Sequence, residues 1–133
     1  MLLVDDDPLC RSTLAVLMQD EFEVVEAAGP TIARSEVSAR CGRFDVVLTD
    51  YEMPDGDGVA LLTSLAEEHP HLIGILVTAH EKYAQAAAAR QDDAFFRILL
   101  KPYDPELLLS SVRGAVSLAR MRTSTARLGP TTR

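Results

Sequence analysis

The sequence predicts one α/β domain, a doubly wound sheet of five parallel strands with helices on both faces. Apolar runs alternate with helix-like segments five times within about 120 residues, which is the pattern of repeated strand–helix units. The runs 45–48 and 72–77 show no alternation of polar and apolar residues, as expected of central strands covered on both faces. A length of 133 residues suits a single domain.

The first strand–helix unit begins with the apolar run 1–4, which is the first predicted strand. Asp7 and Pro8 follow it. Aspartate is a preferred helix N-cap and proline is favoured at the first helical position, so we expect a helix from here to about Asp20. Residues 24–27 form the second predicted strand.

The second helix begins after the Gly29-Pro30 pair, because this pair ends the preceding strand. The helix should run to about Arg40, with Gly42 at the C′ position just beyond its end. The third predicted strand, 45–50, is a buried run that ends in a carboxylate.

The remaining elements repeat the same alternation. A loop rich in proline and glycine separates the third strand from the next helix. The last helix opens at a proline and carries an apolar stripe at helical spacing. The predicted segments are the loop 53–58, the helix 59–68, the strand 72–78, the helix 81–91, the strand 95–100 and a helix from Pro105 onward.

The charge of the chain is divided unevenly along its length. The net charge is −7, but residues 1–106 hold all 20 acids with 8 bases, whereas residues 107–133 hold five arginines and no acid. The body therefore carries −12 and the tail +5. An acidic body argues against nucleic-acid binding by the main fold. The basic tail alone could contact an acidic partner or nucleic acid, but a helix end followed by a solvated linker is the favoured interpretation.

Neither the cysteines nor the histidines of the sequence suggest a zinc site. Cys10 and Cys41 lack CxxC spacing and are too few for a disulfide framework, so we expect reduced thiols in a cytoplasmic protein. His69 and His71 lie in a loop and are expected to be exposed, without a third ligand. No apolar run approaches the roughly 18 residues of a membrane span.

Polar side chains directly follow four of the predicted strands. Asp5 and Asp6 follow the first, Asp50 ends the third, Thr78 ends the fourth and Lys101 follows the fifth. The carboxyl ends of parallel strands meet at one edge, where such sheets bind ligands. Two carboxylates about 4 Å apart repel by roughly 4 kcal/mol at an effective dielectric of about 20. Lys101 or a hard divalent cation such as Mg²⁺ would offset that repulsion.

Four short motifs contain these strand ends. In order they are Leu3-Val4-Asp5-Asp6-Asp7-Pro8, then Asp45-Val46-Val47-Leu48-Thr49-Asp50-Tyr51-Glu52-Met53-Pro54 with Asp57-Gly58, then Val77-Thr78-Ala79 and Leu100-Lys101-Pro102. With this order and spacing, the sequence resembles the receiver domain of two-component response regulators over about residues 1–118. The resemblance implies the flavodoxin-like strand order 2-1-3-4-5.

The resemblance implies a phosphoryl-transfer role for three side chains. Asp50 would be the phosphoacceptor that attacks a phosphohistidine of a partner. Thr78 would hydrogen-bond one phosphoryl oxygen and Lys101 would pair with another. A cis peptide bond between Lys101 and Pro102 would aim the lysine inward. The domain would then catalyse only its own phosphorylation and dephosphorylation, unlike a turnover enzyme.

The resemblance also implies a Mg²⁺ site. Asp6 and Asp50 would ligate the ion directly, Glu52 would supply its backbone carbonyl, and Asp5 would hold the ion through water. The side chains of Glu52 and His80 stand where relatives tune the loss of the phosphoryl group. A solvated surface role for these two side chains is an equal alternative.

The expected partner is a sensor histidine kinase or a phosphotransfer protein, in the cytoplasm. Residues 119–133 are expected to be the end of the last helix and a basic linker or tail, leading to an output domain or ending a single-domain relay. The stretch 94–105 resembles receivers that precede HD-type phosphodiesterase domains. The face formed by 86–90, 95–97 and 106–113 is the expected output surface and homodimer contact.

One residue departs from the family pattern and keeps a second function open. Many receivers carry an aromatic residue three positions before the lysine, and here that residue is Ile98. A pseudo-receiver that acts as a constitutive interaction module is therefore the main alternative. A haloacid dehalogenase-type phosphohydrolase is disfavoured because Glu52 replaces its second aspartate. A calcium loop at 55–58 is disfavoured because the EF-hand spacing fails.

Overall fold

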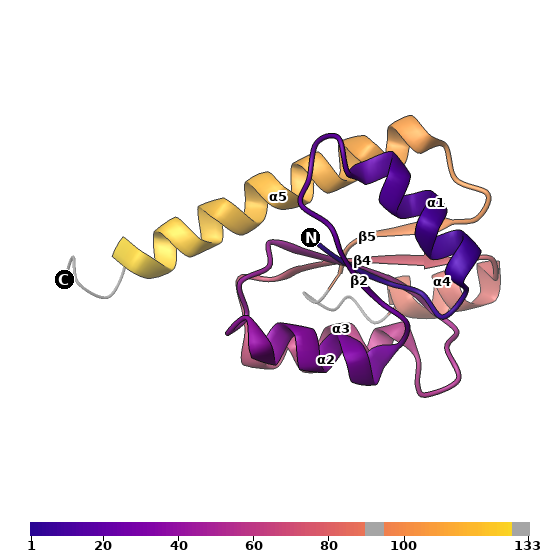
Figure 1. Cartoon of the computed structure of the whole chain (residues 1–133), viewed down its shortest axis with the longest axis horizontal. Helices are drawn as coiled ribbons and strands as arrows, with labels where there is room; N and C mark the ends of the chain where they lie inside the picture. The colour runs from indigo at the N-terminus through magenta and orange to yellow at the C-terminus, as the bar shows by residue number, and fades with distance from the viewer. Residues whose placement is uncertain (90–94, 129–133) are drawn as a thin grey trace.

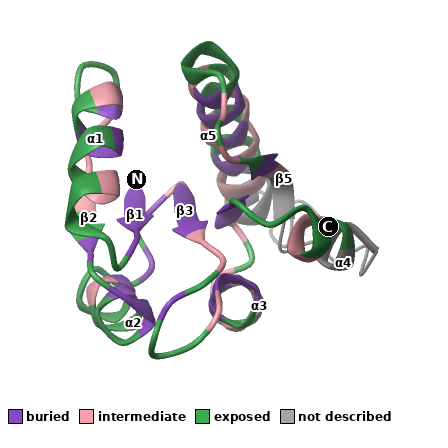
Figure 2. Ribbon diagram, turned by 90° about the vertical axis from the view of Figure 1, so that its right-hand side faces the viewer, coloured by how far each residue is buried: buried purple, intermediate pink, exposed green. Residues whose placement is uncertain are grey.

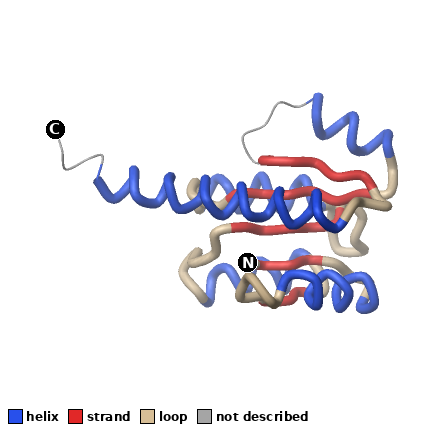
Figure 3. The backbone as a smooth tube through the Cα atoms, turned by 90° about the horizontal axis from the view of Figure 1, so that it is seen from above, coloured by secondary structure: helices blue, strands red, loops and turns tan. Residues whose placement is uncertain are grey.

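Five parallel strands form one sheet in the order β2-β1-β3-β4-β5 in the computed structural model of the chain (Figures 1 and 3). This is the predicted order. Each strand begins or ends within one or two residues of its expected position, which is the ordinary uncertainty of element boundaries. The strands are β1 (Leu2–Val4), β2 (Val25–Ala27), β3 (Val46–Asp50), β4 (Ile73–Thr78) and β5 (Phe95–Leu100).

Helices cover both faces of this sheet, as predicted. Helices α1 and α5 pack on one face, and α2 and α3 pack on the other (Figure 1). Helix α4 contacts β4 and β5. The helices are α1 (Pro8–Met18), α2 (Pro30–Ala39), α3 (Gly58–Glu68), α4 (Glu81–Ala89) and α5 (Pro105–Leu128).

The structure describes residues 1–89 and 95–128. The predicted end of the fourth helix at Gln91, and Arg90 of the expected output surface, lie outside these residues. Within the described ranges, no helix combines the length and the apolar character needed to cross a membrane.

Two apolar clusters, one on each face of the sheet, make up the core. Successive strand residues point to opposite faces, so Leu2 and Val4 join α2 and α3 while Leu3 joins α1 and α5. The central strands β3 and β4 contribute to both clusters, which explains why their sequences show no polar alternation. Figure 2 shows the buried faces of α1 and α5 turned toward the strands.

The start of α1 confirms the predicted cap. Asp7 is the N-cap: its Oδ1 accepts a hydrogen bond from the backbone N–H of Leu9 at 2.9 Å, and Pro8 is the first helical residue. The cap satisfies a backbone donor that has no partner within the helix. Because Asp7 is used in this way, it does not join the other acidic residues of the same motif.

The end of α2 differs from the prediction by one residue. Cys41, not Gly42, occupies the C′ position, with φ +54°. The N–H of Cys41 donates to the Ser38 carbonyl at 3.1 Å and that of Gly42 donates to the Val37 carbonyl at 2.8 Å, the two bonds of a Schellman motif. Gly42 is still required: its φ is +74°, and a Cβ there would lie 2.3 Å from Nδ1 of His69.

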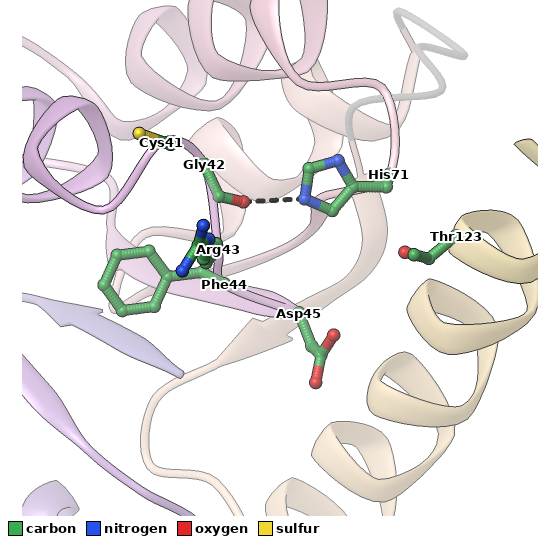
Figure 4. A pocket seen from close by; sticks show the side chains of 7 residues that line it. All are labelled: Cys41, Gly42, Arg43, Phe44, Asp45, His71 and Thr123. Atoms are coloured by element: carbon green, nitrogen blue, oxygen red, sulfur yellow. Dashed lines mark hydrogen bonds between the residues drawn. The ribbon is translucent and has the colours of Figure 1, made fainter. Parts of the chain in front are cut away.

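The two loop histidines are half-buried, so the expectation that they are exposed was wrong. Nε2 of His71 lies 2.7 Å from the carbonyl oxygen of Gly42 (Figure 4). The ring of His69 packs against the same glycine. His71 borders a hollow of about 390 Å³ whose lining is Cys41, Gly42, Arg43, Phe44, Asp45, His71 and Thr123. Residues 41–45 precede β3 and His71 precedes β4, so the hollow lies at the amino ends of these strands, beside Thr123 of α5.

Helix α5 continues past the sheet as one helix (Figure 1). Arg113 donates from Nε to Oε2 of Glu21 at 2.8 Å, and Arg120 places Nε 3.5 Å from Oδ2 of Asp45. The arginines of the basic tail therefore include side chains that attach α5 to the acidic body. The domain boundary predicted at residue 118 falls within this helix and stays a prediction.

Candidate functional site

The strand register brings the predicted site residues to one edge of the sheet. Val4 of β1 pairs with Thr49, the residue before Asp50, so Asp5 lies next to Asp50. Asp50 in turn pairs with Val77, the residue before Thr78. On the far side, Thr78 pairs with Leu100, and the backbone N–H of Lys101 donates to the Thr78 carbonyl at 2.7 Å.

Three carboxylates meet at this edge. Asp5, Asp6 and Asp50 each place a carboxylate oxygen within 4.8 Å of the others. They differ in exposure: Asp5 is buried, Asp50 is half-buried and Asp6 is exposed. Asp5 is fixed on the inner side, because its Oδ1 accepts the N–H of Asp7 at 2.9 Å. Asp6 is the outermost of the three.

The two inner carboxyls are costly to ionise. Burial raises the pKa of Asp5 and of Asp50 above the usual carboxyl range, and the ammonium of Lys101 only partly opposes this. Lys101 places Nζ 3.7 Å from Oδ2 of Asp50 and 3.8 Å from Oδ2 of Asp5. The Lys101–Pro102 peptide bond is cis, as the resemblance implied. One lysine thus faces both inner carboxylates, and negative charge remains to be offset.

A tight loop fixes the direction of Asp50. The backbone N–H of Tyr51 donates to Oδ1 of Asp50 at 2.8 Å, and the N–H of Gly58 donates to the Tyr51 carbonyl at 2.8 Å. A Cβ on Gly58 would lie 2.3 Å from the carbonyl oxygen of Asp50. The approach of the loop to the strand therefore requires glycine at this position. Oδ2 of Asp50 remains directed toward Lys101.

Thr78 is buried at the end of β4. Its Oγ1 accepts a hydrogen bond from the backbone N–H of His80 at 3.1 Å. A hydroxyl can also donate, so Thr78 keeps its own proton available for an oxygen at the site. Ile98, which replaces the usual aromatic residue, is half-buried against the core cluster on the α2 and α3 face.

The side chains of Glu52 and His80 meet beside the carboxylates. Oε2 of Glu52 lies 3.2 Å from Nε2 of His80, and both side chains are more than half exposed. The carboxylate of Glu52 therefore pairs with His80 and is not directed at the acidic cluster. Only its backbone carbonyl, as the resemblance implied, is left for a role there.

Two tyrosines at this edge make a contact that was not predicted from the sequence. Tyr51 and Tyr83 stack with ring centroids 4.4 Å apart and an interplanar angle of 7°. The carboxylate of Glu52 beside Tyr83 raises the pKa of the phenol. A signal was present in the sequence, because Tyr83 is the one large apolar side chain of the fourth helix, EKYAQAAAA.

An apolar groove of about 520 Å³ borders the site on the α1 side. It lies between α1 and the segment that joins β5 to α5. Leu9 at its rim is 75 % exposed, so it offers apolar area at the entrance of the groove. The lining residues are Leu9, Cys10, Thr13, Leu14, Ala79, Lys101, Pro102 and Tyr103.

The donor set at the edge fits a hard divalent cation together with a phosphoryl group. Three carboxylate oxygens within reach of one another are the ligands that Mg²⁺ prefers, and a cation would offset their crowded negative charge. An ammonium and a buried hydroxyl flank the same place, and both can bind phosphate oxygens. This combination suits phosphoryl transfer to a carboxylate.

Comparison with known proteins agrees with this site. Residues 1–113 match the family described as response regulator receiver domain. A solved receiver domain protein from Clostridium thermocellum is 26% identical, with a TM-score of 0.82 over 90% of this chain and 95% of that one. The signal receiver domain of an HD domain-containing protein from Pseudomonas fluorescens is also 26% identical, with a TM-score of 0.84 over 92% and 90%.

A curated relative shows the same domain within a longer protein. The C4-dicarboxylate transport transcriptional regulatory protein DctD of Pseudomonas aeruginosa is 34% identical over 91% of this chain. The chain spans only 26% of the length of that relative. The family match covers most of the chain, and the strand order and the acidic edge are those of its fold. The chain therefore belongs to the response regulator receiver domain family of two-component signalling.

Proposed function

We propose that this domain accepts a phosphoryl group on Asp50 from a phosphohistidine of a histidine kinase or phosphotransfer protein. One observation carries the proposal: Asp50 is surrounded at the sheet edge by Asp5, Asp6 and Lys101, with its Oδ2 held 3.7 Å from the lysine. The assembled set favours a phosphoacceptor over a pseudo-receiver. A pseudo-receiver would have no need to keep three crowded acids and a lysine together.

The transfer is a single displacement at phosphorus. An oxygen of the Asp50 carboxylate forms a bond to phosphorus as the bond from phosphorus to the histidine nitrogen breaks, and the electron pair of that bond leaves with the imidazole. Tyr51 holds the other carboxylate oxygen through its N–H. The protein takes little part in the covalent chemistry beyond the Asp50 carboxylate. Its contribution is to position the reacting groups and to stabilise the charge on the phosphoryl oxygens.

Lys101 and Thr78 stabilise the transferred group. The ammonium of Lys101 faces the place where negative charge gathers on the phosphoryl oxygens, and the hydroxyl of Thr78 donates to another of them. Asp6, Asp50 and the carbonyl of Glu52 would hold Mg²⁺, with Asp5 acting through water. When bound there, the ion would supply positive charge to the phosphoryl oxygens.

The apolar groove beside Lys101 is the surface on which the phosphohistidine partner would dock. A partner must bring its imidazole to within about 3–3.5 Å of the Asp50 carboxylate, so it must cover the surface next to Lys101. The groove adjoins that lysine, and Leu9 offers apolar area at its rim. An apolar partner surface suits these residues better than a charged one.

The output and location of the protein are proposed from its relatives. DctD is a transcriptional regulatory protein and the Pseudomonas fluorescens neighbour belongs to an HD domain-containing protein, so receivers of this kind occur in proteins of different output. We propose that phosphorylation switches an output domain or partner through the face of α4, β5 and α5, with dimerisation across that face, in the cytoplasm.

Phosphorylation with a small donor tests the proposal. Acetyl phosphate with Mg²⁺ should label the wild type on Asp50. Asp50→Asn should remove the label, and Asp6→Asn should weaken the binding of Mg²⁺. Because the donor lacks a protein surface, this experiment isolates the site from docking. Absence of label in folded, Mg²⁺-binding wild type with several phosphodonors would overturn the proposal.

A further inference from the structure

Two hydrogen bonds join the phosphorylation site to the loops that follow β3 and β4. Oδ1 of Asp50 accepts the N–H of Tyr51 at 2.8 Å, and Oγ1 of Thr78 accepts the N–H of His80 at 3.1 Å. Both acceptors are side-chain atoms that phosphorylation would rearrange. A change at the site therefore reaches the backbone of Tyr51 and His80 directly.

The side chains of these two loops converge on Tyr83 of α4. Its ring stacks on Tyr51 at 4.4 Å between centroids and meets the edge of His80 at 5.1 Å and 71°. Glu52, from the loop after Asp50, places Oε2 3.2 Å from Nε2 of the same His80. We call Tyr51, Glu52, His80 and Tyr83 the Tyr83 cluster. It links the loop after the acceptor to the first turn of α4.

Tyr83 is also the principal apolar anchor available to α4. The other residues of this helix are alanines and the polar Glu81, Lys82 and Gln85. An alanine-rich helix is held by propensity and offers little apolar area to bury. We therefore expect the stack of Tyr83 on Tyr51 to position the start of α4.

The contact could replace the aromatic residue that the family usually places on β5. Ile98 packs into the core cluster on the α2 and α3 face, and its β-branched side chain has few rotamers. Tyr51 packs against the same cluster and presents its ring to Tyr83. An aromatic contact next to the site is thus present, but it comes from α4 and from the residue after Asp50.

We propose that Tyr83 is a positioning residue that couples phosphorylation of Asp50 to the position of α4, through its stack on Tyr51 and its contact with His80. The inference rests on the proposed phosphoacceptor function. Phosphorylation alters the acceptors of the Tyr51 and His80 N–H groups, the two loops shift, and the ring of Tyr83 carries the shift into α4. A helix that offers little apolar area to bury is cheap to move.

Amide hydrogen exchange of the full chain, with and without beryllofluoride and Mg²⁺, tests the coupling. In wild type, beryllofluoride should change exchange at the strand ends near 50–53 and 78–80 and also in α4. In Tyr83→Ala the response at the strand ends should remain and the response of α4 should be lost. Tyr83→Phe keeps the ring and should restore it. Lys82→Ala, an exposed change on the same turn, is the matched control and should behave as wild type.

A second variant distinguishes loss of the coupling from a general loss of α4 structure. Tyr51→Leu removes the partner ring and leaves the sequence of α4 intact, so it should also lose the α4 response. An unchanged α4 response in both Tyr83→Ala and Tyr51→Leu would overturn the inference. If wild type shows no response even at the strand ends and takes no label from acetyl phosphate, the proposed function itself fails and the coupling fails with it.

Discussion

At the scale of single residues, the crowded carboxylates of the site lower the stability of the folded chain, and a bound cation would restore it. Burial raises the pKa of Asp5 and Asp50, so the folded chain holds their protons more tightly than the unfolded chain. For a carboxyl with a raised pKa, folding stability falls as pH rises from the unfolded pKa, about 3.9, through the folded pKa. The acidic cluster therefore destabilises the metal-free protein at neutral pH.

Asp50→Asn should stabilise the metal-free protein at pH 7 by on the order of 1 kcal/mol, because it removes one of three crowded charges. Asparagine can still accept the Tyr51 N–H through its Oδ1. The gain should shrink as pH is lowered into the carboxyl range, where Asp50 itself becomes neutral. Urea denaturation in EDTA at several pH values measures both effects. A loss of more than about 1 kcal/mol at pH 7 would contradict this account.

Gly58→Ala should damage the site through the backbone. The new methyl group would lie 2.3 Å from the Asp50 carbonyl oxygen and 3.0 Å from Cγ2 of Thr49, so the loop must shift. We expect a loss of about 1–3 kcal/mol in stability, the usual cost of overpacking, together with slower phosphorylation. Denaturation and acetyl phosphate labelling of the variant check the two parts. Wild-type stability and a wild-type labelling rate in this variant would contradict the close contact between residue 58 and the Asp50 carbonyl.

At the scale of elements, two segments border the site and have different tasks. Helix α1 borders the groove beside Lys101, where the proposed phosphoryl donor would dock. Helix α4 begins at the Tyr83 cluster, through which the proposed signal would leave the site. The groove lining and the Tyr83 cluster share no residue, so we expect donor recognition and signal output to be separable by mutation.

Leu9→Glu should separate docking from chemistry. A carboxylate at the groove rim would oppose an apolar partner surface, so transfer from a phosphorylated histidine kinase should slow by about tenfold or more. Labelling by acetyl phosphate should stay at the wild-type rate, because that donor needs no groove. Val16→Glu, the same kind of change at an exposed position of α1 outside the groove lining, serves as the control. Equal slowing with both donors would place Leu9 in the chemistry and contradict the docking proposal.

At the scale of the whole molecule, local signals made the fold and the acidic edge predictable. The apolar runs of β3 and β4, and the Asp7-Pro8 start of α1, act through neighbouring residues, so sequence alone indicated them. The strand order then brought Asp5, Asp50 and Lys101 together, as the resemblance implied.

The features that sequence did not indicate depend on contacts between distant segments. Tyr51 and Tyr83 meet only because β3 and β4 are neighbours and their following loops turn toward each other. His69 and His71 are half-buried because the loop before β4 packs on Gly42, more than 25 residues away. Cys41 takes a left-handed conformation that is uncommon outside glycine, so propensity favoured Gly42 at that position.

The site of the covalent phosphate tests the central claim most directly. Borohydride reduces an aspartyl phosphate to homoserine, which marks the acceptor permanently. Wild-type protein treated with acetyl phosphate and Mg²⁺, reduced, digested and analysed by mass spectrometry should carry homoserine at position 50 and unmodified aspartate at positions 5 and 6. Homoserine at Asp5 or Asp6 instead of Asp50, or at none of the three in protein that carries label, would contradict the account.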